Sequence, residues 1–249
     1  MVGQPSRVIV VNFSPDARGL TAAIVDFFGS ERVELICVGV ATRVAAEEAL
    51  AGIAGVDPRY VEGSVSLGVD RFVAILQAAQ LGLPDATAVI VLPHHASAEV
   101  DAHSRLTCVA LGLACGDRPL PNTVVAIEDP EASFEFSGLG VTTIFYPGFL
   151  RAALFAHACV DLPVFHFILA LLRGRFRLQT LAIPAELRER SFGAACMGLE
   201  RDPEGRPITL VGVFAVDPEG GAPTMAINPG QKFALTRAAS LLAISERRR

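Results

Sequence analysis

Short runs of β-branched and aliphatic residues alternate with segments of helical periodicity over the first two thirds of the chain. Runs that stay apolar at consecutive positions are typical of strands that a parallel sheet buries on both faces. Six such runs predict strands at residues 8–12, 33–38, 59–61, 88–92, 123–127 and 142–145. Helical spacing predicts helices at residues 16–28, 43–53, 69–81, 100–114 and 148–158. The alternation predicts an α/β fold built on a Rossmann-like, doubly wound parallel sheet.

The pattern changes after residue 172, where a short basic link at residues 173–177 ends the alternation. The remainder predicts a strand, a helix that opens at Ser191, a hairpin around a turn at residues 217–221, and a last strand. These strands are expected at residues 178–183, 208–216, 223–227 and 240–245. We therefore predict three parts: a Rossmann-like lobe (1–147), a helix-turn-helix crossover (148–174) and a small α+β C-terminal lobe (175–249).

The predicted crossover is more apolar than two short solvent-exposed helices require. Asp161 and Pro163 interrupt it near its middle, so it reads as two helices and not as a membrane span of about 20 apolar residues. Its large apolar residues are Phe149, Leu150, Leu154, Phe155, Leu162, Val164, Phe165, Phe167, Ile168, Leu171 and Leu172. The whole chain is 51% hydrophobic and only 19% charged. We expect a partner subunit to cover part of this surface.

Charge and cysteine usage narrow the class of protein. The net charge of −5, from 21 basic and 26 acidic residues, gives no electrostatic reason to expect nucleic acid. Five scattered cysteines in mostly apolar surroundings favour buried thiols in a reducing compartment over a disulfide framework. The short polar start does not resemble a signal peptide, so we expect a cytosolic location.

The loop after the first strand is a candidate ligand loop that lacks the dinucleotide fingerprint. No glycine occupies the G-x-G-x-x-G positions between Asn12 and Arg18, and Phe13, Pro15 and Asp16 add bulk and negative charge there. The second strand also ends without the acidic residue that would bind a ribose. A fingerprint-based NAD site is therefore not expected. Asn12, Ser14 and Asp16 stay candidates for a nucleotide or another ligand held differently.

Carboxylates follow the fifth strand at Glu128, Asp129 and Glu131, and Asp101 opens the preceding helix. If the two segments are neighbours, these oxygen ligands suit a hard divalent cation such as calcium. The alternative is a solvated loop, because the Asp129-Pro130 pair starts a turn by itself.

Two enzyme classes stay open as alternatives. A metal-dependent hydrolase would use His94, His95, Asp101 and His103, although their spacing matches no zinc signature. An NAD(P)-linked oxidoreductase would need a degenerate form of the missing fingerprint. No G-x-S-x-G motif anchors a serine hydrolase.

The order of several weak motifs resembles RCK domains, the regulators of potassium conductance. The strand at residues 88–92 and the helix start at 101–107 resemble the family's D-A-x-S-x-L-T segment. Residues 124–131 resemble its I-V-A-E…D-P-E segment, and residues 138–147 resemble its G-A-D-x-V-I-x-P segment. In the C-terminal lobe the matching pieces are residues 183–184, 191–193, 211–213 and 227–229.

This resemblance implies a regulator and not an enzyme. Family members dimerise through the crossover, assemble into octameric rings on the cytosolic side of the membrane, and act on the gate of a potassium channel or a Trk/Ktr transporter. The missing fingerprint places this chain nearer the ion-sensing branch. In calcium-activated members the ion-binding carboxylates match Asp101 and Glu128, with Asp129 and Glu131 adjacent.

Overall fold

The computed structural model describes residues 6–28, 33–53, 56, 58–172, 175–215 and 224–246. The chain divides into two compact units, Met1–Ala156 and His157–Arg249. The first unit has one sheet with a hydrophobic core on each face, and the second unit has its own sheet and a single core.

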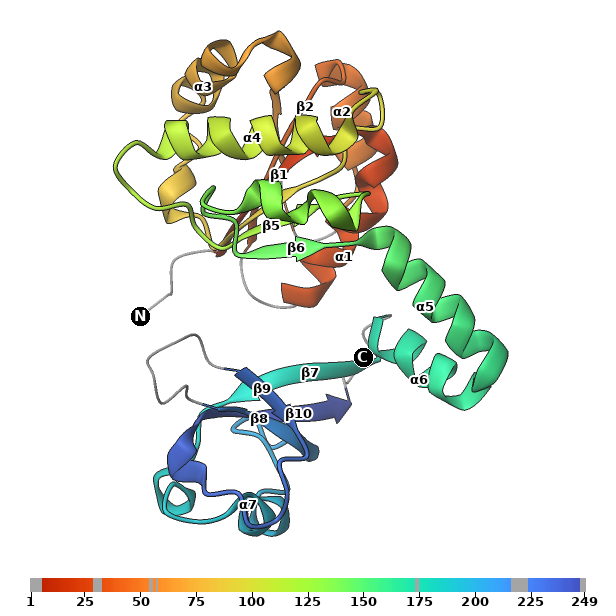
Figure 1. The fold of residues 1–249 in the computed structure, drawn as a ribbon, viewed down its shortest axis with the longest axis vertical. Helices are drawn as coiled ribbons and strands as arrows, with labels where there is room; N and C mark the ends of the chain where they lie inside the picture. The colour runs from red at the N-terminus through yellow and green to blue at the C-terminus, as the bar shows by residue number, and fades with distance from the viewer. Residues whose placement is uncertain are drawn as a thin grey trace. The chain divides into compact units, whose positions relative to one another are not determined.

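The first unit is built on a six-stranded sheet in which all neighbouring strands run parallel (Figure 1). Its strands are β1 (Ser6–Phe13), β2 (Val33–Gly39), β3 (Arg59–Glu62), β4 (Ala88–Val91), β5 (Thr123–Ala126) and β6 (Thr143–Phe145). The order across the sheet is β3-β2-β1-β4-β5-β6. Strand order therefore reverses between β1 and β4, and parallel sheets of this kind bind ligands at that switch point.

Helices cover both faces of this sheet, as the two separate cores record. The helices are α1 (Arg18–Phe28), α2 (Arg43–Leu50), α3 (Val69–Ala78) and α4 (Val100–Cys115). Val25 of α1 and Leu50 of α2 belong to one core, whereas Phe72 of α3 and Leu111 of α4 belong to the other. The predicted Rossmann-like, doubly wound sheet is confirmed.

Two apolar helices follow β6, as the sequence predicts. They are α5 (Pro147–Val160) and α6 (Leu162–Leu172). Asp161 ends the first and caps the second, because its carboxylate accepts a hydrogen bond from the Val164 amide at 3.1 Å. Within the described ranges, every helix lacks either the length or the continuous apolarity that a bilayer-spanning segment needs.

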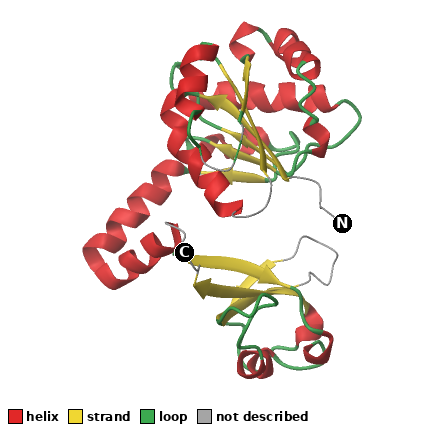
Figure 2. Cartoon of the chain, turned by 180° about the vertical axis from the view of Figure 1, so that it is seen from behind, coloured by secondary structure: helices red, strands yellow, loops and turns green. Residues whose placement is uncertain are grey.

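Besides α6, the second unit contains a four-stranded antiparallel sheet with a short helix on one face (Figure 2). Its strands are β7 (Phe176–Leu181), β8 (Ile208–Ala215), β9 (Thr224–Ile227) and β10 (Ala238–Glu246), in the order β7-β10-β8-β9. Ser191 caps α7 (Phe192–Gly198) by accepting the Ala194 amide. The predicted α+β lobe is confirmed, whereas its expected turn at 217–221 and the start of the basic link at 173–174 lie outside the described residues.

The cysteines divide into two groups. Cys37, Cys108 and Cys115 are buried as expected, and burial raises the pKa of the Cys37 and Cys108 thiols to about 12. Cys159 and Cys196 are exposed, so the expectation of buried thiols is wrong for these two. Cys159 lies on α5, whose side chains are not packed into a core of this chain.

Candidate functional site

Asn12 forms the centre of the switch point, where it joins the ends of β1 and β4. Its backbone has a φ of +61°, which asparagine tolerates better than most residues. The register between β1 and β2 shifts between Val11 and Phe13, so Asn12 is the extra residue of a bulge. Its side-chain amide donates to the Leu92 carbonyl at 2.9 Å. The side chain that sequence analysis offered to a ligand therefore fastens the two loops together.

Ser14 and Asp16 lie at the surface of the same loop. Ser14 is half-buried at the start of a 3₁₀ turn (Pro15–Ala17), and its hydroxyl makes no capping hydrogen bond. Asp16 is exposed in the first turn. Phe13, by contrast, is buried and packs edge-to-face on Tyr60, with ring centroids 6.2 Å apart. The expectation that Phe13 adds bulk to the loop is therefore wrong, because its ring belongs to the core.

Two of the three histidines considered for a hydrolase, His94 and His103, form a stacked pair. The rings of His94 and His103 lie 4.4 Å apart, and the His103 Nε2 lies 3.4 Å from the Ser64 hydroxyl. Burial, followed by repulsion from His94, lowers the pKa of His103 to about 4. Burial, followed by the neighbouring His95, also lowers the pKa of His94. Both imidazoles are consequently neutral near pH 7.

Asp101 connects α4 to the loop after β5. Its two carboxylate oxygens accept the amides of Glu128 and Asp129, each at 2.8 Å. The Asp129 carboxylate in turn accepts the Glu131 amide at 2.9 Å and caps the 3₁₀ segment Pro130–Phe136. The two segments are neighbours, as the cation hypothesis required, but the Asp101 oxygens are held by backbone amides. Glu128, Asp129 and Glu131 are exposed.

The contacts of Asp101 and of the stacked histidines keep the candidate metal ligands apart. In the part of the chain that the structure describes, no group of three or more histidine, cysteine or acidic side chains converges on one point. The hydrolase alternative loses its geometric basis, because Asp101 turns to the β5 loop while His94 and His103 stack on each other. A cation would have to rearrange Glu128 and Glu131, so that site stays a prediction.

Comparison with solved structures identifies the fold. The human SLO3 gating ring matches 98% of this chain with a TM-score of 0.69 and 16% sequence identity. The fold is that of an RCK domain. The GsuK RCK domain matches 97% of the chain, at 16% identity and a TM-score of 0.39, and 44% of its own length is covered. The GsuK channel bound to NAD matches 98%, at 15% identity and a TM-score of 0.38, with 37% of its length covered.

The RCK assignment rests on the SLO3 match, since TM-scores below 0.5 add nothing to it. The chain spans about half of the SLO3 gating-ring chain, of which 48% is covered. No family model and no curated protein sequence matches the chain. The similarity thus lies in the path of the backbone and not in the sequence. This agrees with the sequence motifs of the RCK resemblance, each of which is weak by itself although their order along the chain is that of the family.

Two apolar surfaces stand out on this RCK fold. The first concerns the crossover helices, each taken by itself: neither α5 nor α6 has a buried side chain, and Phe149 and Phe155 on α5 are 74% and 66% exposed, whereas Phe167 on α6 is 45% exposed. The second, here named the α4 stripe, comprises the exposed Leu106 and Leu113 of α4 together with the exposed Phe134 of the 3₁₀ segment that contacts α4. The ion pair between Arg105 and Glu135 holds the turn that carries Phe134 against α4. The apolar excess of the crossover is evident in the sequence, whereas the α4 stripe was not predicted from it.

Proposed function

We propose that this chain is a cytosolic regulatory unit of a gating ring that controls a potassium channel or a potassium transporter. The observation that carries the proposal is the match to the human SLO3 gating ring along 98% of the chain. A regulatory unit needs two lobes, surfaces for assembly and a place where ligand occupancy changes the structure. The oxidoreductase and hydrolase alternatives are not favoured.

The crossover proposal concerns residues 148–174. A soluble subunit rarely leaves such a large apolar surface in water, because each exposed phenylalanine or leucine loses the gain from burial. A second copy that contributes the same two helices would cover Phe149, Phe155 and Phe167 by symmetry. This homodimer would be the building block of the ring, and the α4 stripe would join dimers into an octamer. The ring in turn would attach to a membrane pore or transporter subunit.

The test of this function is the oligomeric state. Light scattering on a size-exclusion column should find dimers or larger assemblies at micromolar concentrations. Only monomers, at every concentration and with every ligand tried, would contradict the proposal.

The ligand proposal concerns the loop after β5. Glu128, Asp129 and Glu131 present exposed carboxylates on a loop that Asp101 fixes to the start of α4. Calcium bound by Glu128 and Glu131 would pull on this loop, and the Asp101 hydrogen bonds would transmit the displacement to α4. Since α4 carries the proposed ring contact, ligand binding and assembly would be coupled.

The ligand test compares melting temperatures with and without calcium. Wild type should be stabilised by calcium, because a ligand that binds only the folded state raises its stability. The double variant Glu128→Gln with Glu131→Gln should lose the calcium response while retaining its melting temperature in chelator. The matched control is Glu47→Gln with Glu48→Gln on α2. An equal calcium response in wild type and the Glu128/Glu131 variant would remove this site.

A further inference from the structure

The sheet of the second unit has an apolar face on the side opposite α7, which is named here the open sheet face. Residues that pair across antiparallel strands point to the same side of a sheet. Val213 and Leu241 pair with each other and pack in one core with Phe192 of α7, so their neighbours in each strand point the other way. The open sheet face consists of Phe176 and Leu178 of β7, Phe214 of β8, Met225 and Ile227 of β9, and Ile244 of β10.

The composition of the open sheet face is unusual for a surface in water. Leu178 is 48% exposed, Met225 60% and Ile227 59%. Antiparallel sheets that leave one face in water normally carry polar residues on that face. Among the described residues that point to this side, the charged one is Glu246 at the end of β10, and it pairs with Arg175 at 3.7 Å. The face is therefore apolar and without unbalanced charge, as a buried contact requires.

Helix α6 makes the open sheet face continuous with the crossover. The ring of Phe167 on α6 lies 5.9 Å from the ring of Phe176, between centroids, and α6 packs against β7. Both elements belong to the second unit. Phe167 itself is 45% exposed, and Leu172 at the end of α6 is 49% exposed. The apolar surface of α6 thus continues onto the sheet.

The size of a stable interface indicates what covers this face. Helices α5 and α6 are 14 and 11 residues long. A helix turns about half of its surface to a partner, so the two helices supply roughly 12 residues, whereas a stable interface uses about 20–30 residues on each side. The crossover helices alone are too small for a stable dimer, and the open sheet face supplies a surface that adjoins them.

We propose that the open sheet face belongs to the dimer contact, where a second copy of this chain covers it together with α6. This inference rests on the proposed gating-ring function, because it assumes a dimer formed through the crossover. A face without unbalanced charge gives a different protein no charge pattern to recognise. A twofold contact needs only that each copy brings the same apolar patch. The dimer would then hold the C-terminal lobe as well as the crossover helices.

The test uses the three methionines of the full chain, Met1, Met197 and Met225, labelled with ¹³C at the methyl group. Met197 lies on α7, is 83% exposed and serves as the internal control. In the dimer, a soluble gadolinium chelate should broaden the Met225 signal severalfold less than the Met197 signal. In the monomers expected of Phe155→Glu with Phe167→Glu, both signals should broaden. Equal broadening of the two signals in the dimer would overturn the proposal.

A second measurement uses Met225→Glu with Ile227→Glu. The dimer dissociation constant should rise by about tenfold or more, because each glutamate would be buried without a partner. Met197→Glu is the matched control and should leave the constant unchanged. An unchanged constant in the Met225/Ile227 variant would overturn the proposal.

Two further outcomes separate this inference from the proposed function. Protection of Met225 in the monomeric variant would show that the same chain covers the face, and would overturn this inference alone. A wild type that stays monomeric would overturn both.

Discussion

His103 makes the stability of the first unit depend on pH. Its pKa is lowered from an ordinary 6.5 to about 4 in the folded chain, chiefly by burial. As pH falls below about 6.5, the unfolded chain takes up the proton first, so the free energy of unfolding decreases until about pH 4. We expect this group to account for a loss of up to about 3 kcal/mol over that range.

The measurement is urea unfolding at several pH values between 7 and 4.5 in wild type and His103→Gln. Carboxylates titrate in both proteins, so the difference between the two curves isolates the histidine. The variant should lose less stability than wild type as the solution is acidified. Parallel curves would show that the histidine has the same pKa in the folded and unfolded chain, which would contradict this prediction.

Gly39, at the end of β2, lies close to the backbone of Phe13 at the end of β1. A Cβ at this position would lie 2.0 Å from the Phe13 carbonyl oxygen, a backbone atom that cannot turn aside. We expect Gly39→Ala to lower the free energy of unfolding by about 1–3 kcal/mol. Gly112→Ala is the matched control, because it adds a methyl group to open space on α4 and should stabilise the helix by about 0.5–1 kcal/mol. Equal melting temperatures for the two variants would contradict this account.

Individual helices and strands follow closely from the sequence, because burial on both faces leaves a continuous apolar pattern. The predicted run at residues 33–38 became β2, and the run at 88–92 became β4. The cation hypothesis required Asp101 and the β5 loop to be neighbours, and they are, since both follow the carboxyl ends of the adjacent strands β4 and β5. The role of Asp101 could not be predicted, because its partners are backbone amides whose direction depends on the folded loop.

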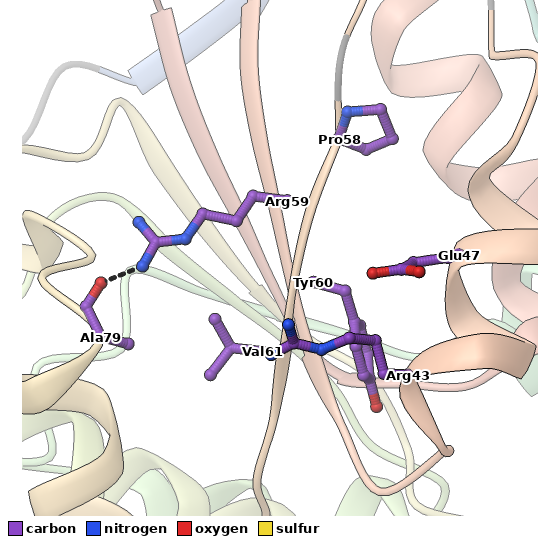
Figure 3. Close-up of a pocket in the computed structure, with 7 residues that line it drawn as sticks. All are labelled: Arg43, Glu47, Pro58, Arg59, Tyr60, Val61 and Ala79. Carbon is purple, nitrogen blue, oxygen red and sulfur yellow. Dashed lines mark hydrogen bonds between the residues drawn. The ribbon is translucent and has the colours of Figure 1, made fainter.

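A groove of about 660 Å³ beside β3, shown in Figure 3, could not be read from the sequence either. Its lining comes from three separate segments, and its character depends on β3 being an edge strand. Pro58, directly before this strand, is consistent with an edge position, but a proline alone does not indicate a groove. The α4 stripe was missed for a related reason: Leu106 and Leu113 have ordinary helical spacing, which predicts an apolar face without saying what covers it.

The helices α5 and α6 carry the prediction about dimerisation. We expect Phe155→Glu with Phe167→Glu to give monomers, because each glutamate would lie in a buried interface without a partner. The melting of either unit should change little, since both side chains are exposed in the single chain. Val44→Glu, an equally exposed position on α2, is the control and should keep the oligomeric state of wild type. Light scattering distinguishes these outcomes.

At the scale of the whole molecule, two surfaces of different composition imply two steps of assembly. The crossover helices present several phenylalanines, and the α4 stripe presents the smaller set Leu106, Leu113 and Phe134. A small interface contributes less binding free energy and should separate first on dilution. The ring would then dissociate into dimers before the dimers dissociate into monomers.

Leu106→Glu with Leu113→Glu tests this order of assembly. Both residues are exposed on α4, at 43% and 54%, so charge there should not unfold the first unit. The variant should form dimers at concentrations where wild type forms larger assemblies, because glutamates would face each other across the ring contact. Its mass by light scattering should match that of diluted wild type. Monomers would instead place the α4 stripe in the dimer contact, and assemblies of unchanged size would exclude the stripe from the ring contact. Stable dimers would show that α4 joins subunits whose crossover helices are already paired.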